Sequence, residues 1–149
     1  MKKLFIYFSL SGNGEVVAKQ LEAKGYEIRR VFKKGQKANK KPGFFTIFRG
    51  GFRAGMNKKD KLEPYDTNIE GYDEIVIGSP IWNSKFSCPI NRVLDDLDLK
   101  DKNLSFIFYS GSGTAEKAVE RVSKEYPDSK IIILKEPKKY EDELFKIIL

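Results

Sequence analysis

Five short apolar runs, separated by helix-like stretches, constrain the fold of this chain more than any other feature. Four of the runs are almost continuously apolar and rich in Ile, Val, Phe or Tyr, as in strands buried on both faces of a parallel sheet. The remaining run contains Arg29 and Arg30, which predicts a strand at the edge of the sheet. The predicted strands are residues 4–8, 27–32, 74–78, 104–109 and 130–134.

Apolar residues recur at helical spacing between these runs and after the last one. The pattern predicts helices over 14–24, 89–97 and 114–126, and Pro127 marks the end of the third helix. The tail shows a helix-like pattern at Leu144, Phe145 and Ile148. Regular alternation of strands and helices predicts an α/β fold with a doubly wound parallel sheet and right-handed crossovers.

The size and composition of the chain fit a single domain over residues 1–149. No segment approaches the roughly 20 apolar residues that cross a bilayer, and no signal peptide is visible after Met1. Cys88 is the single cysteine and cannot form an internal disulfide, so a cytoplasmic location is expected. We expect Cys88 to be a small buried residue rather than a redox centre.

The chain contains no histidine, which excludes the Ser-His and Cys-His nucleophile systems and the commonest zinc ligand. We therefore expect no catalytic side chain and no metal site. Any difficult chemistry is expected to belong to a bound cofactor.

Positive charge is concentrated in residues 33–61, which carry ten Lys or Arg residues and one acidic residue. The net charge of this basic segment is +9, whereas the rest of the chain is −2. Phe44, Phe48 and Phe52 lie four residues apart in it and would line one side of a helix. The segment is interpreted as a solvated insert, or as a docking surface for an acidic protein, an anionic substrate or an anionic membrane. No motif supports nucleic-acid binding.

A cluster of small polar residues and glycines follows the first predicted strand, in the stretch YFSLSGNGEVVA at residues 7–18. Ligands of open parallel sheets bind beyond the carboxyl ends of the strands, and helix N-termini hold phosphate groups through free N–H groups. The stretch is neither a P-loop nor a dinucleotide-binding motif. Taken alone, it fits a helix cap and a phosphate site equally well.

Two further loops of the same kind follow the third and fourth predicted strands, at residues 78–83 and 109–113. Because the carboxyl ends of parallel strands share one edge of the sheet, all three loops should open on the same side. Each combines small polar residues with glycine, and the two later loops also bring an aromatic residue. This combination indicates a mononucleotide with a planar head group.

The three stretches YFSLSGNGEVVA, IGSPIW and YSGSG resemble, in order and spacing, the three FMN-binding loops of short-chain flavodoxins. The resemblance extends over nearly the whole chain. It implies a flavodoxin-like, doubly wound three-layer sandwich with a five-stranded parallel sheet of order 2-1-3-4-5. The basic segment would be an insert between the second and third strands, and FMN would be the cofactor.

The resemblance also implies which residues contact FMN. The first loop would surround the phosphate, the second would border the ribityl chain and the flavin ring, and the third would contact the pyrimidine edge. Trp82 is the aromatic residue expected beside the ring, and the alternative is that it packs on the protein. The implied FMN-binding residues are Ser9, Ser11, Gly12, Asn13, Gly14, Ser79, Pro80, Ile81, Trp82, Asn83, Tyr109, Ser110, Gly111 and Gly113.

Three positions depart from the flavodoxin pattern. Gly14 stands where the family usually has Thr, and Asn83 where it often has an aromatic residue or Gly. Glu15 adds a negative charge in the first turn of the predicted helix. A lost hydrogen bond to a charged group costs about 1.5–3 kcal/mol, so FMN binding should be weakened rather than abolished.

Three functions are consistent with the sequence. The first is an FMN-binding electron-transfer flavoprotein, whose redox partner would be an acidic protein docked on residues 33–61. The phenylalanines of this basic segment would cover one face of the sheet, and its lysines would lie near the edge of the flavin. The second is an FMN-dependent oxidoreductase that acts on a quinone or another small acceptor. The third is a flavodoxin-fold binding module without flavin, for which Gly14 and Glu15 are the sequence argument.

Overall fold

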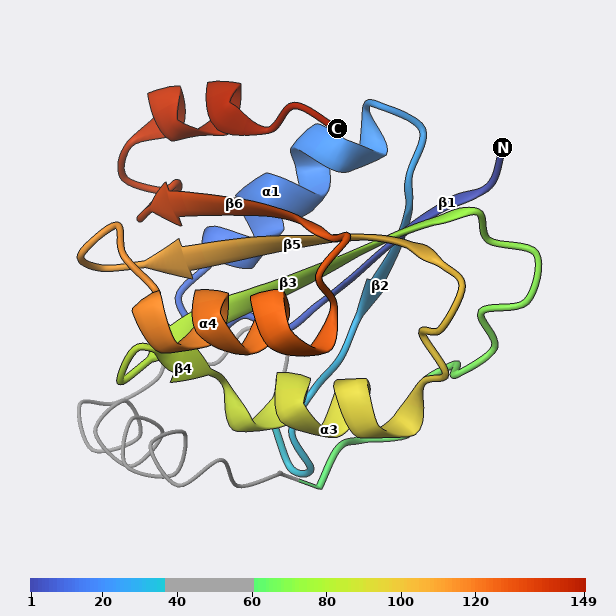
Figure 1. Ribbon diagram of the computed structural model, residues 1–149. Helices are drawn as coiled ribbons and strands as arrows, with labels where there is room; N and C mark the ends of the chain where they lie inside the picture. The colour runs from blue at the N-terminus through green and yellow to red at the C-terminus, as the bar shows by residue number, and fades with distance from the viewer. Residues whose placement is uncertain (37–60) are drawn as a thin grey trace.

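The computed structural model describes residues 1–36 and 61–149 (Figure 1). The predictions that concern the phenylalanines and most lysines of the basic segment fall on residues 37–60, outside the described residues. Strands and helices alternate along most of the described chain as the sequence predicts. The elements are β1 (Lys3–Tyr7), α1 (Asn13–Glu22), β2 (Glu27–Arg30), β3 (Glu74–Trp82), β4 (Lys85–Phe86), α3 (Cys88–Asp96), β5 (Asn103–Ser110), α4 (Glu116–Glu125), β6 (Lys130–Lys135) and the 3₁₀ helix η1 (Glu141–Lys146). The exception is that β2, β3 and β4 follow one another with no helix between them among the described residues.

All described strands except β4 form a parallel sheet in the order β2-β1-β3-β5-β6. Numbered among themselves along the chain, these strands have the order 2-1-3-4-5, and β2 lies at the edge as its two arginines predict. The sequence did not predict β4, which pairs antiparallel with β3. Asn83 and Ser84 join the two strands with φ angles of 50° and 64°, the left-handed geometry of a tight hairpin.

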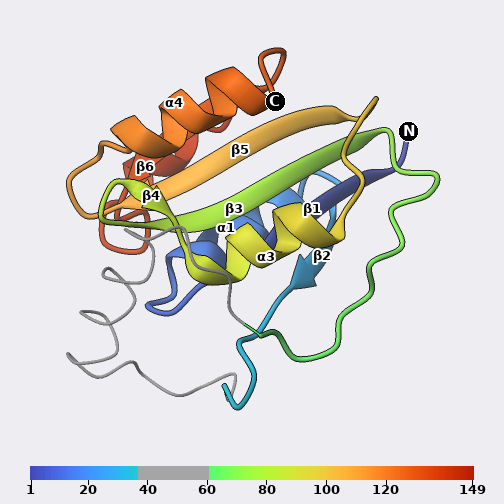
Figure 2. The ribbon, with the colours of Figure 1, turned by 60° about the horizontal axis from the view of Figure 1, so that its bottom comes forward.

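The sheet has a helical layer on each face (Figures 1 and 2). Alternation along β1 shows how the sequence builds both layers, because successive side chains of a strand point to opposite faces. Leu4 and Ile6 pack in the core cluster that includes residues of α3 and α4. Phe5 and Tyr7 pack in the second cluster, with residues of α1. The near-continuous apolar runs of the sequence thus reflect burial on both faces.

The predicted apolar pattern of the tail is wrong. Phe145 and Ile148 are 80% and 73% exposed, whereas Ile147 is 2% exposed and packs in the cluster with α1. The tail forms the 3₁₀ helix η1, in which residues three apart share a face. Leu144 and Ile147 therefore point to the same side, and Leu144 packs against the same cluster.

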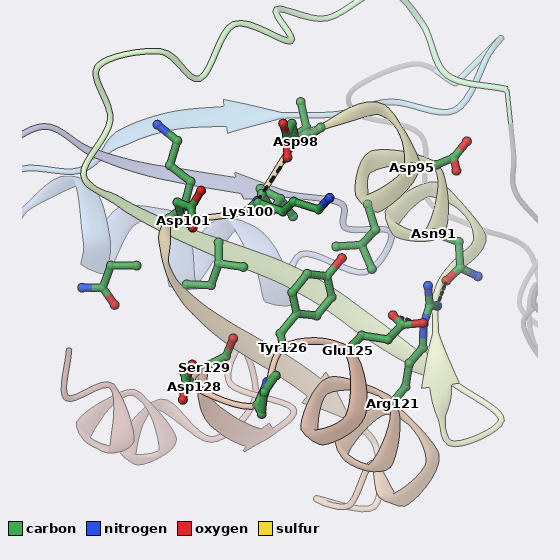
Figure 3. Close-up of a pocket in the computed structure, with 17 residues that line it drawn as sticks. Asn91, Asp95, Asp98, Lys100, Asp101, Arg121, Glu125, Tyr126, Asp128 and Ser129 are labelled. Atoms are coloured by element: carbon green, nitrogen blue, oxygen red, sulfur yellow. Dashed lines mark hydrogen bonds and ion pairs between the residues drawn. The ribbon is translucent and has the colours of Figure 1, made fainter.

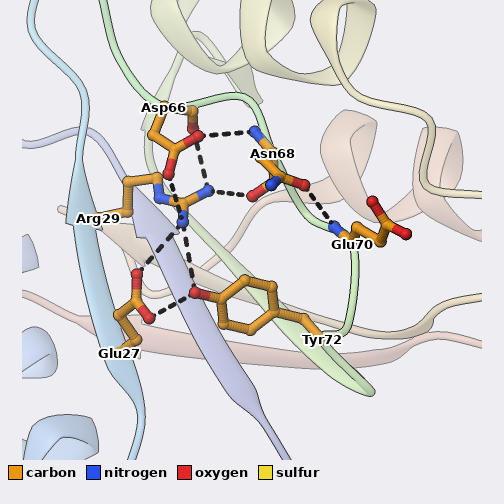
Figure 4. A network of polar contacts seen from close by, with 6 residues as sticks. All are labelled: Glu27, Arg29, Asp66, Asn68, Glu70 and Tyr72. Carbon is orange, nitrogen blue, oxygen red and sulfur yellow. Dashed lines mark hydrogen bonds and ion pairs between the residues drawn. The ribbon is translucent and has the colours of Figure 1, made fainter.

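A buried arginine fastens β2 to the segment that leads into β3 (Figure 4). Arg29 donates to the backbone carbonyls of Asp66 and Asn68 at 3.0 and 2.9 Å, and its Nη2 lies 3.2 Å from a carboxylate oxygen of Glu27. The Tyr72 hydroxyl donates to the same Glu27 side chain. A buried guanidinium must have its N–H groups satisfied, so this network fixes where the chain returns to the sheet. Among the described residues, no helix is long and apolar enough to cross a membrane.

Candidate functional site

Three loops meet at the edge where β1, β3 and β5 end. The sheet order places β2 on one side of β1 and β3 on the other, so strand order reverses between β1 and β3. The Phe8 amide donates to the Gly78 carbonyl at 3.2 Å, and the Tyr109 hydroxyl donates to the Phe8 carbonyl. The structure thus brings the start of the first loop into contact with both β3 and β5.

The first loop ends in an open helix N-terminus. Gly12 is the N-cap residue of α1, has a φ of 96° and provides no side-chain cap. Ser9 Oγ instead accepts a hydrogen bond from the Gly14 amide at 3.1 Å, and Asn13 Nδ2 donates to Ser11 Oγ at 3.2 Å. Within the described residues, the Gly12 and Asn13 amides have no acceptor. Free amides at a helix N-terminus attract anions.

The close packing around Gly14 explains why threonine is absent there. A Cβ atom on Gly14 would lie 2.6 Å from Tyr7 Cδ2, 2.7 Å from Ser9 Cβ and 2.9 Å from the Tyr109 hydroxyl oxygen. No side chain fits at such distances without displacing its neighbours. The tyrosines beneath the loop therefore occupy the space that a threonine would need.

Arg30 balances the negative charge that Glu15 brings to the loop. Arg30 Nη1 lies 2.6 Å from Glu15 Oε1, and Arg30 Nη2 donates to the Ser9 carbonyl at 3.2 Å. Ser9 Oγ donates to the other carboxylate oxygen of Glu15 at 2.7 Å. The guanidinium also stacks 4.7 Å from the Phe32 ring centroid. The sequence predicted Arg30 only as an edge-strand residue, because nothing in its spacing indicated a contact with Glu15.

The sequence predicts that the third strand ends at residue 78, but β3 continues to Trp82, so most of the predicted second loop is the end of this strand. Part of this stretch is turned into the protein. Ser79 is fully buried, and its Oγ accepts a hydrogen bond from the Ser87 amide at 3.2 Å. Trp82 is 9% exposed and meets Phe8 edge-on with ring centroids 5.8 Å apart. Trp82 thus packs on the protein, the alternative that the sequence left open. Pro80 and Ile81 at the end of β3 are half-buried and Asn83 in the turn that follows is exposed, so these residues form the accessible part of the stretch.

The third loop begins with a buried residue, Tyr109, and has an exposed tip. Tyr109 is buried, and burial raises the pKa of its hydroxyl well above the ordinary value, so the group remains a hydrogen-bond donor. Hydroxyl groups stabilise the tip, since Ser112 Oγ lies 3.1 Å from Ser110 Oγ and 2.8 Å from Thr114 Oγ1. Gly111 is exposed and Gly113 half-buried, which leaves their backbone groups accessible to a ligand.

A lysine that the sequence did not single out lies against the first loop. The Lys138 amide donates to Asn13 Oδ1 at 3.0 Å, and Lys138 Nζ donates to the Ser11 carbonyl at 3.3 Å. Lys138 follows β6, far from the loop in the sequence. The only sequence signal was a pair of adjacent lysines after Pro137, which carries no information about a contact with residues 11–13.

A cavity of about 640 Å³ lies at the opposite edge of the sheet (Figure 3). It is lined by the C-terminal ends of α3 and α4 and by the segments that lead into β5 and β6. Arg121 lines the cavity and donates to Asn91 Oδ1 at 2.6 Å and to Glu125 Oε2 at 3.0 Å. None of the residues predicted to bind FMN lines this cavity. Among the described residues, no group of three or more acidic, Cys or His side chains is placed to hold a metal ion.

Comparison with known proteins identifies structural relatives only. No protein-family model and no curated protein matches the chain. A flavoprotein from Lactobacillus acidophilus NCFM, solved in complex with FMN, is 21% identical over 95% of this chain and 97% of its own, with a TM-score of 0.67. A candidate flavoprotein from Bacteroides uniformis ATCC 8492 is 22% identical over 88% of this chain and 89% of its own, with a TM-score of 0.69. The chain shares the fold of these proteins, with the strand order of flavodoxin-like domains.

Proposed function

We propose that this protein binds FMN at the edge where β1, β3 and β5 end, and transfers electrons through the bound flavin. The observation that carries the proposal is the open N-terminus of α1, which lies at the point where strand order reverses. Ligands of doubly wound sheets bind at this point, and a helix N-terminus there favours a phosphate group.

The donor groups of the first loop fit a phosphate. The amides of Gly12 and Asn13 lie at the helix N-terminus, and the side chains of Ser11 and Asn13 are accessible. Gly14 contributes no hydroxyl, but Glu15 is held by Arg30 and Ser9, so its charge is balanced within the protein. These residues would bind and orient the phosphate end of FMN.

The other two loops would hold the rest of the cofactor. Pro80, Ile81 and Asn83 would border the ribityl chain and one side of the ring, and backbone groups at Gly111 and Gly113 would meet its polar edge. The flavin would supply the redox chemistry, so no nucleophile is needed. The FMN complex of the similar Lactobacillus acidophilus flavoprotein supports this assignment.

Asn13→Asp tests the phosphate end of the site. The substitution keeps an oxygen that can accept from the Lys138 amide, now 3.0 Å from Asn13 Oδ1, and it adds a negative charge. Two unit charges about 4 Å apart in water interact with roughly 1 kcal/mol, and a phosphate group carries nearly two negative charges, so repulsion of roughly 1–2 kcal/mol is expected if FMN binds with its phosphate beside this residue. We expect FMN affinity, measured by quenching of flavin fluorescence, to fall about tenfold, with riboflavin binding unchanged.

The controls separate binding from function. Equal loss of FMN and riboflavin affinity would show that the substitution disturbs the loop, and a wild-type protein that does not bind FMN would contradict the proposal.

Anaerobic titration of the FMN-loaded protein with a reductant tests the electron-transfer role. Two resolved one-electron steps support a carrier, whereas a single two-electron step with rapid turnover of a quinone would identify a reductase.

A further inference from the structure

Lys138 contacts the first loop through both its backbone amide and its side-chain ammonium group. Its amide donates to Asn13 Oδ1 at 3.0 Å, and its Nζ donates to the Ser11 carbonyl at 3.3 Å. The side chain crosses Gly12, since a Cβ atom built on that glycine would lie 3.0 Å from Lys138 Nζ. A residue near the end of the chain is thereby positioned beside the N-terminus of α1.

The ammonium group of Lys138 carries a charge that the described residues do not neutralise. Among the described residues, Lys138 Nζ donates to the Ser11 carbonyl. No carboxylate of the described residues forms an ion pair with this ammonium group. Lys138 is exposed, so the group can turn toward a ligand at the loop. The carboxylate of Glu15, in the first turn of α1, is paired with Arg30 at 2.6 Å. An ammonium group has three donors, of which the carbonyl uses one.

We propose that Lys138 is a phosphate-binding residue that completes the FMN site from outside the three loops. This inference rests on the proposed function. Lys138 supplies a charged donor at a loop where close packing around Gly14 excludes the threonine hydroxyl. The residue therefore sets specificity: it favours the phosphate ester FMN over uncharged riboflavin. Charge-assisted hydrogen bonds of this kind are shorter and stronger than neutral ones.

The neighbouring lysine provides a matched control. Lys139 Nζ lies over the Tyr140 ring, 5.2 Å from its centroid, and so points to a different group. Lys139→Gln removes the same charge one residue away, with the loop contacts of Lys138 intact. Lys138→Gln keeps the amide contact with Asn13, which belongs to the backbone, and removes only the ammonium group. Lys138→Arg keeps the positive charge.

The experiment measures FMN and riboflavin affinities of the wild-type apo-protein and the three variants by flavin fluorescence quenching. For Lys138→Gln we expect FMN affinity to fall roughly fivefold, which corresponds to about 1 kcal/mol, the upper end for an exposed ion pair. Riboflavin affinity should not change, Lys139→Gln should match the wild type, and Lys138→Arg should retain most of the FMN affinity. Inorganic phosphate, with no flavin present, should raise the melting temperature of the wild type and of Lys139→Gln more than that of Lys138→Gln.

Each contrary result has a distinct meaning. A wild type that binds FMN, together with an unchanged Lys138→Gln, overturns the role of Lys138 and leaves the proposed function standing. Equal losses in Lys138→Gln and Lys139→Gln also overturn it, because general surface charge would then explain the effect. A wild type that responds neither to FMN nor to phosphate overturns both the proposed function and the inference.

Discussion

Gly14→Ala should destabilise the protein because the position has no room for a single methyl group. The added Cβ would meet Tyr7 Cδ2 at 2.6 Å and Ser9 Cβ at 2.7 Å, both well inside normal carbon–carbon contact. It would also lie 2.9 Å from the hydroxyl oxygen of Tyr109, which is buried and donates to the Phe8 carbonyl. None of these neighbours is a flexible chain end. Overpacking of this kind costs about 1–3 kcal/mol, and we expect the upper part of that range.

The assay is urea unfolding of the apo-protein, followed by far-UV circular dichroism. Gly111→Ala is the matched control, since a Cβ atom at Gly111 would meet nothing within 4 Å. We expect Gly14→Ala to lower the free energy of unfolding by about 2–3 kcal/mol and Gly111→Ala to change it by less than about 0.5 kcal/mol. Equal stabilities of the two variants would refute the packing explanation for the missing threonine.

Two further predictions concern other regions of the protein. The Tyr72 hydroxyl and then Arg29 lower the pKa of Glu27 below its ordinary value of 4.5. The unfolded state therefore binds the proton more readily, so this stabilisation is present above about pH 4.5 and is lost as the pH falls below it. The urea midpoint of Glu27→Gln should consequently fall less steeply than that of the wild type as the pH is lowered from about 5 to 3. If the midpoints of both proteins fall in parallel, the pKa shift of Glu27 does not contribute to stability. Cys88 is fully buried, so a disulfide reagent should modify it only after denaturant is added. Rapid modification of the native protein would show that the thiol is accessible.

The sequence predicted the sheet well because its signal is local. β1, β3, β5 and β6 are apolar runs, β2 is marked by its arginines as an edge strand, and each of α1, α3 and α4 carries an apolar face at helical spacing. The tail failed for a physical reason: a 3₁₀ helix changes which residues share a face, so Ile147 rather than Phe145 is buried. β4 was missed because two residues carry almost no strand signal, and its hairpin depends on left-handed geometry at Asn83 and Ser84.

The location of the candidate site was predictable, but the contacts within it were not. The loops after β1 and β5 and the last residues of β3 are visible as small polar and glycine residues that follow apolar runs. The pairing of Glu15 with Arg30, the space that Tyr109 takes beside Gly14, and the contact of Lys138 with the loop all join distant parts of the chain. Such contacts are set by side-chain packing across the sheet edge, and no pattern in a single sequence encodes them.

The most direct test of the proposed site is to follow the backbone amide signals of the ¹⁵N-labelled apo-protein by NMR during addition of FMN. The account predicts saturable shifts at Ser11, Gly12 and Asn13, in the accessible part of the second loop, and at Gly111 and Gly113. Signals of residues that line the opposite cavity, such as Asp128 and Ser129, should stay in place. Absence of saturable shifts, or shifts confined to that cavity, would contradict the assignment of this sheet edge as an FMN site.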